Sequence, residues 1–471
     1  TGHRTHVALT AGCLGMREYD PASTSALQKA KEEGIELSYV TVEDPDADRN
    51  TMRVMGEFDG ISWVINGISP GGGCVVIDAI NGMPIDYDGN CYLYYWMADH
   101  LADEGEAVYF LQKIGNPALR LSRGLWQGKE QLCIQLSRPL SQAQEQEIAQ
   151  LLKPAGTLLV RSTEPLHAFA ERAGSVPLFN SFAELLNAAK ERPLIDLVYQ
   201  YEEEHSGQSQ QAILEQGLRI VEVLSESIGR GLEGNNPLIG GFCSGSDGKM
   251  VYQWGNSGQS LAGPVFNEAL ANSLALAERS ASSGRVVAAP TSGAAGTLPG
   301  TLFAVAHRCG ANQEKLAEAF LVSAMLGILI GKDGSFAGSV AGCQVEIGVG
   351  AAMAAGASAW MAGGDAEQVV NAAVIALANC FGLTCDQPVS PVEVPCIKRN
   401  AMGASVALMG AELALAGVKS AMPADDVVIG FLDIQKRMPE GTRGGCMGGL
   451  ATAPYAAEMR QKWEEILKQE V

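Results

Sequence analysis

The sequence predicts a multidomain protein with an α+β N-terminal domain, a βαββαβ middle domain and an all-α C-terminal domain. Three observations support this fold class. Helix-like and strand-like runs are mixed at the start of the chain, they follow a fixed order in the middle, and the last part is helical and rich in Gly and Ala. A chain of 471 residues, of which 47% are hydrophobic, can bury several cores. We place the domains at residues 1–88, 89–170 and 176–471.

The first domain combines one helix with several strands. Residues 23–33 have helical periodicity, and residues 35–42 and 62–68 are strand-like. A Ser-Pro-Gly-Gly-Gly turn follows at 69–73. This mixture is typical of an α+β domain.

The middle domain begins with the strand-like segment 91–96 and continues with a helix at 97–115. Two strand-like segments, a helix with Ser141 as its N-cap, and a last strand complete the domain at 118–126, 131–137, 141–152 and 157–162. This βαββαβ order is the ferredoxin-like pattern, which occurs with many functions and identifies none of them.

The third domain is predicted to be entirely helical. Apolar residues recur at a spacing near 3.6 in the segments 181–190, 208–228, 267–280, 314–330, 351–363 and 365–378. Several segments are apolar around most of their circumference, which indicates a buried central helix. The loops at 292–296, 331–343 and 441–449 are rich in Gly, so their backbone N–H groups are open to a ligand.

Charge and cysteine content narrow the possible partners. The formal net charge is −20, from 33 Lys+Arg against 53 Asp+Glu, and there is no basic run, so we expect no nucleic-acid partner. The 11 cysteines lack the spacing of a disulfide framework, which predicts a reducing, cytoplasmic location with free or metal-bound thiols. The apolar runs, such as residues 320–331, are too short to cross a membrane, and we expect no membrane partner.

Three cysteines of the C-terminal domain are candidates for a metal site. Cys343 ends a Gly-rich loop, and Cys385 and Cys396 flank a Pro-rich loop that a polar cluster follows. Three thiolates leave one position of a tetrahedral zinc, or one corner of an iron–sulfur cube, without a protein ligand. Because the spacing is not C-x-x-C, the pattern alone leaves buried, unreactive cysteines as the alternative.

A second candidate site lies at residues 284–300, where a strand-like run ends. Thr291, Ser292 and Gly293 then lead into a helix, and hydroxyl and amide groups at a helix N-terminus can bind a carboxylate or a phosphate. The alternative is an ordinary capped turn, and neither a Walker A nor a G-x-G-x-x-G pattern is present. His3, in a Gly/Thr turn, is a third candidate, with a surface position as its alternative.

Several motifs together resemble the iron–sulfur L-serine dehydratases. The catalytic domain of that family is similar to the motifs APTSGAAG (289–296), AGCQVEIG (341–348), LTC (383–385), VPCIKRNAMGA (394–404) and RGGCMGGLATAP (443–454). The family's β-type domain is similar to GHRTHVALTAGCLGM (2–16) and GISPGGGCVVIDAINGMPID (67–86), and residues 91–166 look like an ACT domain. The resemblance covers nearly the whole chain.

The resemblance implies an L-serine ammonia-lyase, an enzyme of amino-acid degradation and gluconeogenesis that forms pyruvate and ammonia. It also implies a [4Fe–4S] cluster held by Cys343, Cys385 and Cys396. The iron without a protein ligand would act as a Lewis acid on the substrate hydroxyl group. His3 matches the histidine that is the family's proposed general base.

The same resemblance suggests how a small amino-acid substrate is held. We expect Thr291, Ser292 and Gly293 to bind the substrate carboxylate. Lys398 and Asn400 are expected to bind substrate as polar groups beside the cluster. Because strands of ACT domains commonly pair between chains, we expect a homodimer.

Three departures from the family's pattern affect these expectations. The turn that reads GHGTD in the family is GHRTH in this sequence, so the acid that would orient His3 is replaced. The HPN-type element of the family's allosteric serine site reads Asp48-Arg49-Asn50, and the ACT-like helix begins ADHLADEG instead of Pro-Gly. The family's Ser-Ser-Ser-His-Thr segment precedes the GHGTD-type turn, and we therefore expect a segment before Thr1.

The residues leave other functions open. The same elimination chemistry could act on L-cysteine or L-threonine. A homologue that keeps the fold could instead bind an amino acid without catalysis. A pyridoxal-phosphate dehydratase would need a Schiff-base lysine near a phosphate loop, and the sequence offers no such pairing.

Overall fold

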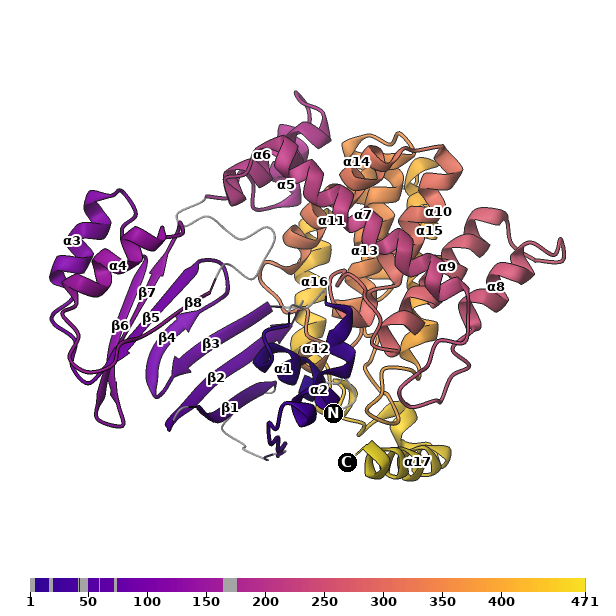
Figure 1. Cartoon of the computed structure of the whole chain (residues 1–471). Coiled ribbons are helices and arrows are strands. Elements are labelled where there is room, and N and C mark those ends of the chain that lie inside the picture. Colours follow the sequence, from indigo (N-terminus) through magenta and orange to yellow (C-terminus); the bar gives the residue numbers. More distant parts are fainter. Residues whose placement is uncertain are drawn as a thin grey trace. The chain divides into compact units, whose positions relative to one another are not determined.

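The chain folds into two compact units. The computed structural model describes residues 5–16, 20–40, 42, 50–58, 60–71, 74–163 and 176–470 (Figure 1). The helical unit comprises Thr1–Glu43, Phe179–Tyr199 and Gln211–Val471, and the sheet unit comprises Asp44–Leu178 and Gln200–Gln210. None of the helices in the described residues is long and apolar enough to cross a membrane. The predicted order, with an α/β region first and a helical region after it, is confirmed. The three domain boundaries remain a prediction.

The sheet unit begins with an antiparallel meander, in which each strand pairs with the next. Its strands are β1 (Thr51–Phe58), β2 (Ile61–Gly71), β3 (Cys74–Ile80) and β4 (Met83–Tyr87). Asn81 and Gly82 join the last two strands with positive φ angles of 51° and 72°, as a type I′ hairpin turn requires. Side chains of β4 alternate between buried and exposed, so Met83, Ile85 and Tyr87 face the core.

The second sheet of this unit carries two helices on one face (Figure 1). Its elements are β5 (Tyr92–Ala98), α3 (Gly105–Lys113), β6 (Arg120–Trp126), β7 (Lys129–Leu136), α4 (Gln142–Leu151) and β8 (Leu159–Thr163). The strands are antiparallel in the spatial order β6-β7-β5-β8. Trp96 packs with the helices and Tyr95 with the first sheet, so β5 is buried on both faces. Ser141 caps α4, as predicted, by accepting a hydrogen bond from the backbone N–H of Gln144.

The first forty residues belong to the helical unit. They form α1 (Thr5–Cys13), the 3₁₀ turn η1 (Pro21–Ser25) and α2 (Ala26–Glu32), so the predicted helix at 23–33 is divided between a 3₁₀ turn and an α-helix. The predicted strand at 35–42 is wrong, because residues 35–40 have no regular structure and Val40 is 80% exposed. A strand needs a partner strand, which β propensity in one segment does not supply.

Helices make up most of the remaining chain. They are α5 (Phe182–Ala188), α6 (Leu194–Ser206), α7 (Gln210–Leu232), α8 (Asp247–Gly255), α9 (Pro264–Ala281), η2 (Ser292–Ala294), α10 (Thr297–Cys309), α11 (Gln313–Gly331), α12 (Gly338–Ala341), η3 (Gln344–Gly348), α13 (Val349–Met361), α14 (Ala366–Ala378), α15 (Cys396–Leu415), α16 (Ala424–Arg437), η4 (Glu440–Thr442), η5 (Gly449–Thr452) and α17 (Tyr455–Glu470). The six helical segments predicted between 181 and 378 coincide with α5, α7, α9, α11, α13 and α14.

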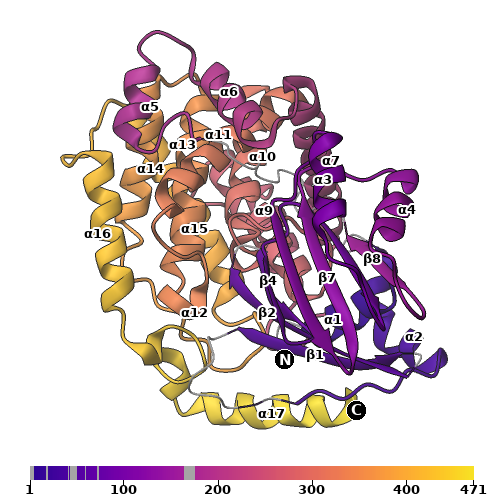
Figure 2. The ribbon, with the colours of Figure 1, turned by 90° about the vertical axis from the view of Figure 1, so that its left-hand side faces the viewer.

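α13 is the buried central helix that the sequence predicts. Each of its residues is buried, and the helix contacts α10, α11, α14 and α15. Figure 2 shows α13, α14 and α15 side by side. Small side chains allow this close packing, since a Cβ atom on Gly356 would lie 3.0 Å from the carbonyl oxygen of Val369 in α14.

α17 covers the Pro-rich loop that precedes α15. Its side chains Met459 and Trp463 pack on Val389 of that loop. Arg460 donates a hydrogen bond to the carbonyl oxygen of Pro388 at 3.3 Å. This packing fixes the segment that lies between two of the predicted ligand cysteines.

Candidate functional site

The three predicted ligand cysteines come from separate segments of the helical unit and lie close together. Cys343 precedes η3, Cys385 follows α14, and Cys396 is the first residue of α15. The thiols of Cys343 and Cys385 are within hydrogen-bonding reach of each other. Cys396 is close enough to Cys343 for their charges to interact. Cys343 and Cys385 also pack in one hydrophobic cluster, and Cys396 lies in their vicinity.

The surroundings of Cys343 and Cys396 favour the neutral thiol. The hydrogen bond with Cys385, together with burial, raises the pKa of Cys343 well above its ordinary value. Burial likewise raises the pKa of Cys396. Arg399 acts in the opposite direction on both groups, because its positive charge favours thiolate. Since the thiolate is the form that binds metals, this cation supports a metal-binding role for the cluster.

Arg399 is held beside the thiols by two neighbouring residues. Its Nη1 lies 3.6 Å from Cys343 Sγ and donates a hydrogen bond to the carbonyl oxygen of Thr384 at 2.6 Å. Its Nη2 pairs with Asp386 Oδ1 at 2.7 Å, and both side chains are largely buried. Asp386 Oδ2 in turn accepts a hydrogen bond from the backbone N–H of Leu450 at 3.1 Å. The C-terminal Gly-rich loop thus contributes to the position of this cation.

The same loop fixes the backbone of Cys385. The N–H of Cys385 donates to the carbonyl oxygen of Thr442 at 2.8 Å, and the N–H of Gly444 donates to the carbonyl oxygen of Cys385 at 2.7 Å. Gly444 and Gly445 have φ angles of 89° and 78°, which other residues rarely adopt. The loop that the sequence predicts as a source of free N–H groups is here paired with a candidate ligand.

Thr291, Ser292 and Gly293 lie in the turn that precedes α10, and Ser292 opens η2. Ser292 and Gly293 line a cavity of about 530 Å³. Another wall of this cavity is formed by α1, which contributes Ala11 among other small side chains. His3 lies outside the described residues, so its predicted role is not addressed by these contacts.

Asn400 connects this turn to the first turn of α15. Its Oδ1 accepts hydrogen bonds from the backbone N–H groups of Gly296 at 2.9 Å and Thr297 at 3.0 Å. Its Nδ2 donates to the carbonyl oxygens of Gly293 at 2.9 Å and Cys396 at 3.0 Å. Asn400 therefore joins one candidate ligand to the predicted carboxylate-binding turn.

Glu346 lies between the turn and the thiols. Its Oε1 accepts a hydrogen bond from Thr291 Oγ1 at 2.8 Å. Its charge acts on Cys343 and Cys396, whose pKa values it helps to raise. Burial raises the pKa of Glu346 itself to about 6.

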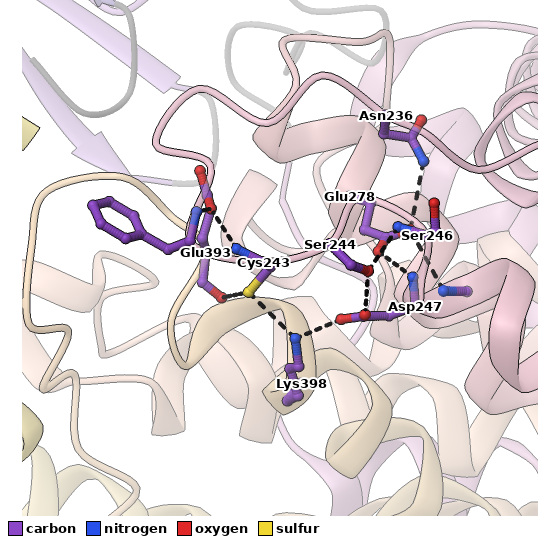
Figure 3. Close-up of polar contacts among 10 residues, drawn as sticks. Asn236, Cys243, Ser244, Ser246, Asp247, Glu278, Glu393 and Lys398 are labelled. Carbon is purple, nitrogen blue, oxygen red and sulfur yellow. Dashed lines mark hydrogen bonds and ion pairs between the residues drawn. The ribbon is translucent and has the colours of Figure 1, made fainter. Parts of the chain in front are cut away.

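Lys398 belongs to a neighbouring polar network (Figure 3). Its Nζ lies 3.2 Å from Cys243 Sγ and 2.5 Å from Asp247 Oδ2. Two buried carboxylates hold the backbone around it: Glu393 accepts hydrogen bonds from the N–H groups of Gly240, Phe242 and Cys243, and Glu278 from that of Asp247. Lys398 therefore forms its hydrogen bonds with this network and not with the three thiols.

Sequence reasoning missed Glu346 and Asp386 as members of the site, and it placed Arg399 there only as part of the polar cluster that follows Cys396. Glu346 stands three residues after Cys343, within a motif that resembles the family. Arg399 follows Cys396 by three residues, on the first turn of the same helix. Their position beside candidate ligands was a usable signal, but their contacts with Thr291 and Asp386 depend on the fold.

Comparison with known proteins identifies the family. The model of the family "Serine dehydratase alpha chain" matches residues 189–451. A probable L-serine dehydratase alpha chain of Bacillus subtilis is 36% identical over 287 residues, which are 60% of this chain and 95% of that protein. An L-serine dehydratase alpha chain of Peptoniphilus asaccharolyticus is 34% identical over 290 residues, 60% of this chain and 98% of that protein. An L-serine dehydratase of Streptomyces coelicolor is 34% identical over 279 residues, 57% of this chain and 60% of that protein. Because the family model covers more than half of the sequence, the chain belongs to the serine dehydratase alpha-chain family.

Proposed function

We propose that this protein is an L-serine dehydratase, an ammonia-lyase that converts L-serine to pyruvate and ammonia. Family membership supports the reaction class. The observation that carries the proposal is the cluster of Cys343, Cys385 and Cys396 beside Arg399, in motifs that the family shares. Such a cluster is expected of an iron–sulfur site and not of a pyridoxal enzyme.

The chemistry of these residues fits a [4Fe–4S] cluster. Among the residues described, no three His, Cys, Asp or Glu side chains converge closely enough to hold a single metal ion. A four-iron cube does not require that convergence, because each thiolate binds a different iron atom. We propose Cys343, Cys385 and Cys396 as the ligands. When bound, the cluster supplies a Lewis-acidic iron that makes the substrate hydroxyl a better leaving group.

The remaining tasks fall to the chain itself. Thr291, Ser292 and Gly293 are proposed to hold the substrate carboxylate with the Ser292 hydroxyl and the backbone N–H groups of the turn. His3 is proposed as the general base that removes the proton from Cα. Loss of this proton and of the hydroxyl group, which leaves as water, gives aminoacrylate. Aminoacrylate tautomerises to the imine, and hydrolysis of the imine yields pyruvate and ammonia.

Direct substrate binding by Lys398 and Asn400 stays a prediction. Asn400 is 2% exposed, and its hydrogen bonds to the turn favour a role in holding Gly293 in place. Lys398 keeps 58% of its side chain exposed beside Asp247, which leaves it able to meet a polar ligand.

The β-rich part of the chain is proposed to contain a β-type domain and an ACT-like domain. The element order β5-α3-β6-β7-α4-β8 and the spatial order β6-β7-β5-β8 support the ACT-like, ferredoxin-like assignment. We propose that such strands pair in a homodimer and that the protein acts in the cytoplasm.

The proposal is tested with protein reconstituted anaerobically with iron and sulfide. Pyruvate release is measured with L-serine, L-threonine and L-cysteine, and bound iron is determined on the same samples. Cys385→Ser is expected to lose bound iron and more than about 99% of the activity, because a cluster ligand is removed. Cys380→Ser is the matched control: Cys380 is also buried, and burial alone accounts for its raised pKa.

Three outcomes would contradict parts of the proposal. Wild-type protein that binds L-serine without forming pyruvate would be a non-catalytic homologue. Faster turnover of L-threonine or L-cysteine would change the substrate. Full iron content and full activity in Cys385→Ser would show that Cys385 is not a ligand, and the proposed set of three cysteines would be wrong.

A further inference from the structure

Glu346 is a largely buried carboxylate that two glycines border. A Cβ atom on Gly293 would lie 2.8 Å from its Oε1, and a Cβ atom on Gly338 would lie 2.6 Å from its Oε2. Any side chain at either position would displace the carboxylate. The two glycines therefore leave room for this group at the end of the predicted carboxylate-binding turn.

Within the described part of the chain, Glu346 has no ion-pair partner. A buried carboxylate is costly unless a cation or several donors compensate for lost hydration. Thr291 provides one donor, and the neighbouring thiols are negative when ionised. The residue as a whole nevertheless keeps part of its surface accessible to water, so a ligand has access to it.

An α-amino acid offers the missing charge. Its ammonium and carboxylate groups are attached to one carbon, so a site must place a negative group within a few ångströms of its carboxylate-binding donors. Gly293 belongs to the turn proposed to bind the carboxylate and also borders Glu346. A ligand held at this turn would thus have its ammonium group within reach of Glu346, with no side chain at position 293 between them.

We propose that Glu346 binds the α-ammonium group of the substrate and so selects amino acids over hydroxy acids that lack the amine. The inference rests on the proposed function, because it assigns a residue to substrate recognition in that same site. Thr291 then has two tasks: its hydroxyl orients Glu346, and its backbone belongs to the turn.

The test compares two ligands on the cluster-loaded protein by isothermal titration calorimetry. L-Alanine carries the ammonium group but not the hydroxyl, and 3-hydroxypropionate carries the hydroxyl but not the ammonium. Neither loses a β-hydroxyl group and an amine to give pyruvate, so binding is measured without turnover. In Glu346→Gln, the Kd for L-alanine is expected to rise at least about tenfold, because a hydrogen bond between charged groups is lost. The Kd for 3-hydroxypropionate is expected to stay within about twofold.

A second variant covers the case in which Glu346→Gln does not fold. Thr291→Val removes the hydroxyl that orients the Glu346 carboxylate. It is expected to raise the Kd for L-alanine but not that for 3-hydroxypropionate, by a smaller factor than Glu346→Gln does. Thr301→Val is its matched control, since Thr301 is also buried and donates to the carbonyl oxygen of Thr297 instead.

The outcomes separate this inference from the proposed function. If Glu346→Gln raises the Kd for both ligands equally, or changes neither Kd, Glu346 does not bind the ammonium group and only supports the turn. Failure of wild-type protein to bind L-alanine would overturn the inference as well. If wild-type protein forms no pyruvate from L-serine, the proposed function is contradicted instead. The ratio of the Kd values for L-alanine and 3-hydroxypropionate would still show whether Glu346 binds an ammonium group.

Discussion

Asn400 shows how much of the site depends on one buried amide. Both ends of its side chain are used: Oδ1 accepts from two backbone N–H groups, and Nδ2 donates to two carbonyl oxygens. These contacts join the turn at Gly293 to the helix that begins at Cys396. A buried network in which each member has a partner specifies one arrangement, and removal of one member leaves the others unsatisfied.

Asn400→Ala is therefore expected to lower the free energy of unfolding by about 3 kcal/mol or more, since four hydrogen bonds to backbone groups are lost. Asn379→Ala is the control, because Asn379 is exposed and makes a hydrogen bond to the carbonyl oxygen of Ile375 at 2.9 Å. That change should cost less than about 1 kcal/mol. Urea unfolding of both variants measures the difference. Unchanged stability with a raised KM for L-serine would instead support direct substrate contact by Asn400.

At this scale the sequence suggests which residues are ligands, which stays a prediction, but it does not suggest their partners. Cys343, Cys385 and Cys396 stand in motifs that resemble a family, so their roles can be carried over residue by residue. The neighbours of those ligands are set by contacts across long stretches of chain. Glu346 meets Thr291 across 55 residues, and no local pattern encodes that contact.

The loop from η4 to η5 is the element that connects the C-terminal region to the thiols. It pairs with Cys385 through Thr442 and Gly444, and it holds Asp386 through Leu450. Gly449 has a φ angle of 57°, and a Cβ atom at this position would collide with the carboxylate of Asp386. A side chain here would therefore disturb the residue that holds Arg399 beside the thiols.

Gly449→Ala is expected to reduce the iron retained after desalting by at least about half, because the cation beside the thiolates is displaced. Gly310→Ala is a closely matched control: Gly310 has a φ angle of 63°, and nothing lies within 4 Å of its Cβ position. Both variants bear the backbone cost of about 1 kcal/mol for a left-handed alanine. Only Gly449→Ala should lose iron. Equal iron content in the two variants would show that the contact with Asp386 is unimportant for the cluster.

Elements whose burial pattern lies within one continuous segment were predicted well in this chain. The predicted helix at 314–330 corresponds to Gln313–Gly331, because its apolar pattern reflects burial within one continuous segment. The predicted strand at 35–42 failed because a strand requires a partner elsewhere in the chain. The helix that begins at Cys396 was not predicted either, since the Pro-rich loop before it hides the start of its periodicity.

At the scale of the whole molecule, the helical unit is built from segments that lie before and after the sheet-forming residues in the sequence. Thr1–Glu43 belongs to this unit, although the sheet-forming residues separate it from Phe179 onward. Within this unit, the cavity beside Ser292 and Gly293 has α1 as one of its walls. Periodicity and composition describe segments one at a time, so they could not show that α1 returns to a site more than two hundred residues later in the chain.

The contribution of α1 can be tested by filling the cavity from that side. Gly12 lines the cavity, and nothing lies within 4 Å of its Cβ position, so Gly12→Leu can be accommodated without a collision with protein atoms. Gly229→Leu in α7 is the control, since its Cβ position is equally open and it does not line the cavity.

Both substitutions replace a glycine within a helix and should stabilise the protein by up to about 1 kcal/mol, or leave its unfolding temperature unchanged. Gly12→Leu alone is expected to lower kcat/KM for L-serine, by at least about tenfold, because the leucine side chain occupies space that the substrate needs next to the turn. Steady-state pyruvate release and a thermal unfolding curve measure the two effects on the same samples. If Gly12→Leu keeps the wild-type kcat/KM, substrate does not pass through or occupy this cavity. The wall formed by α1 would then serve the fold of the helical unit and not its chemistry.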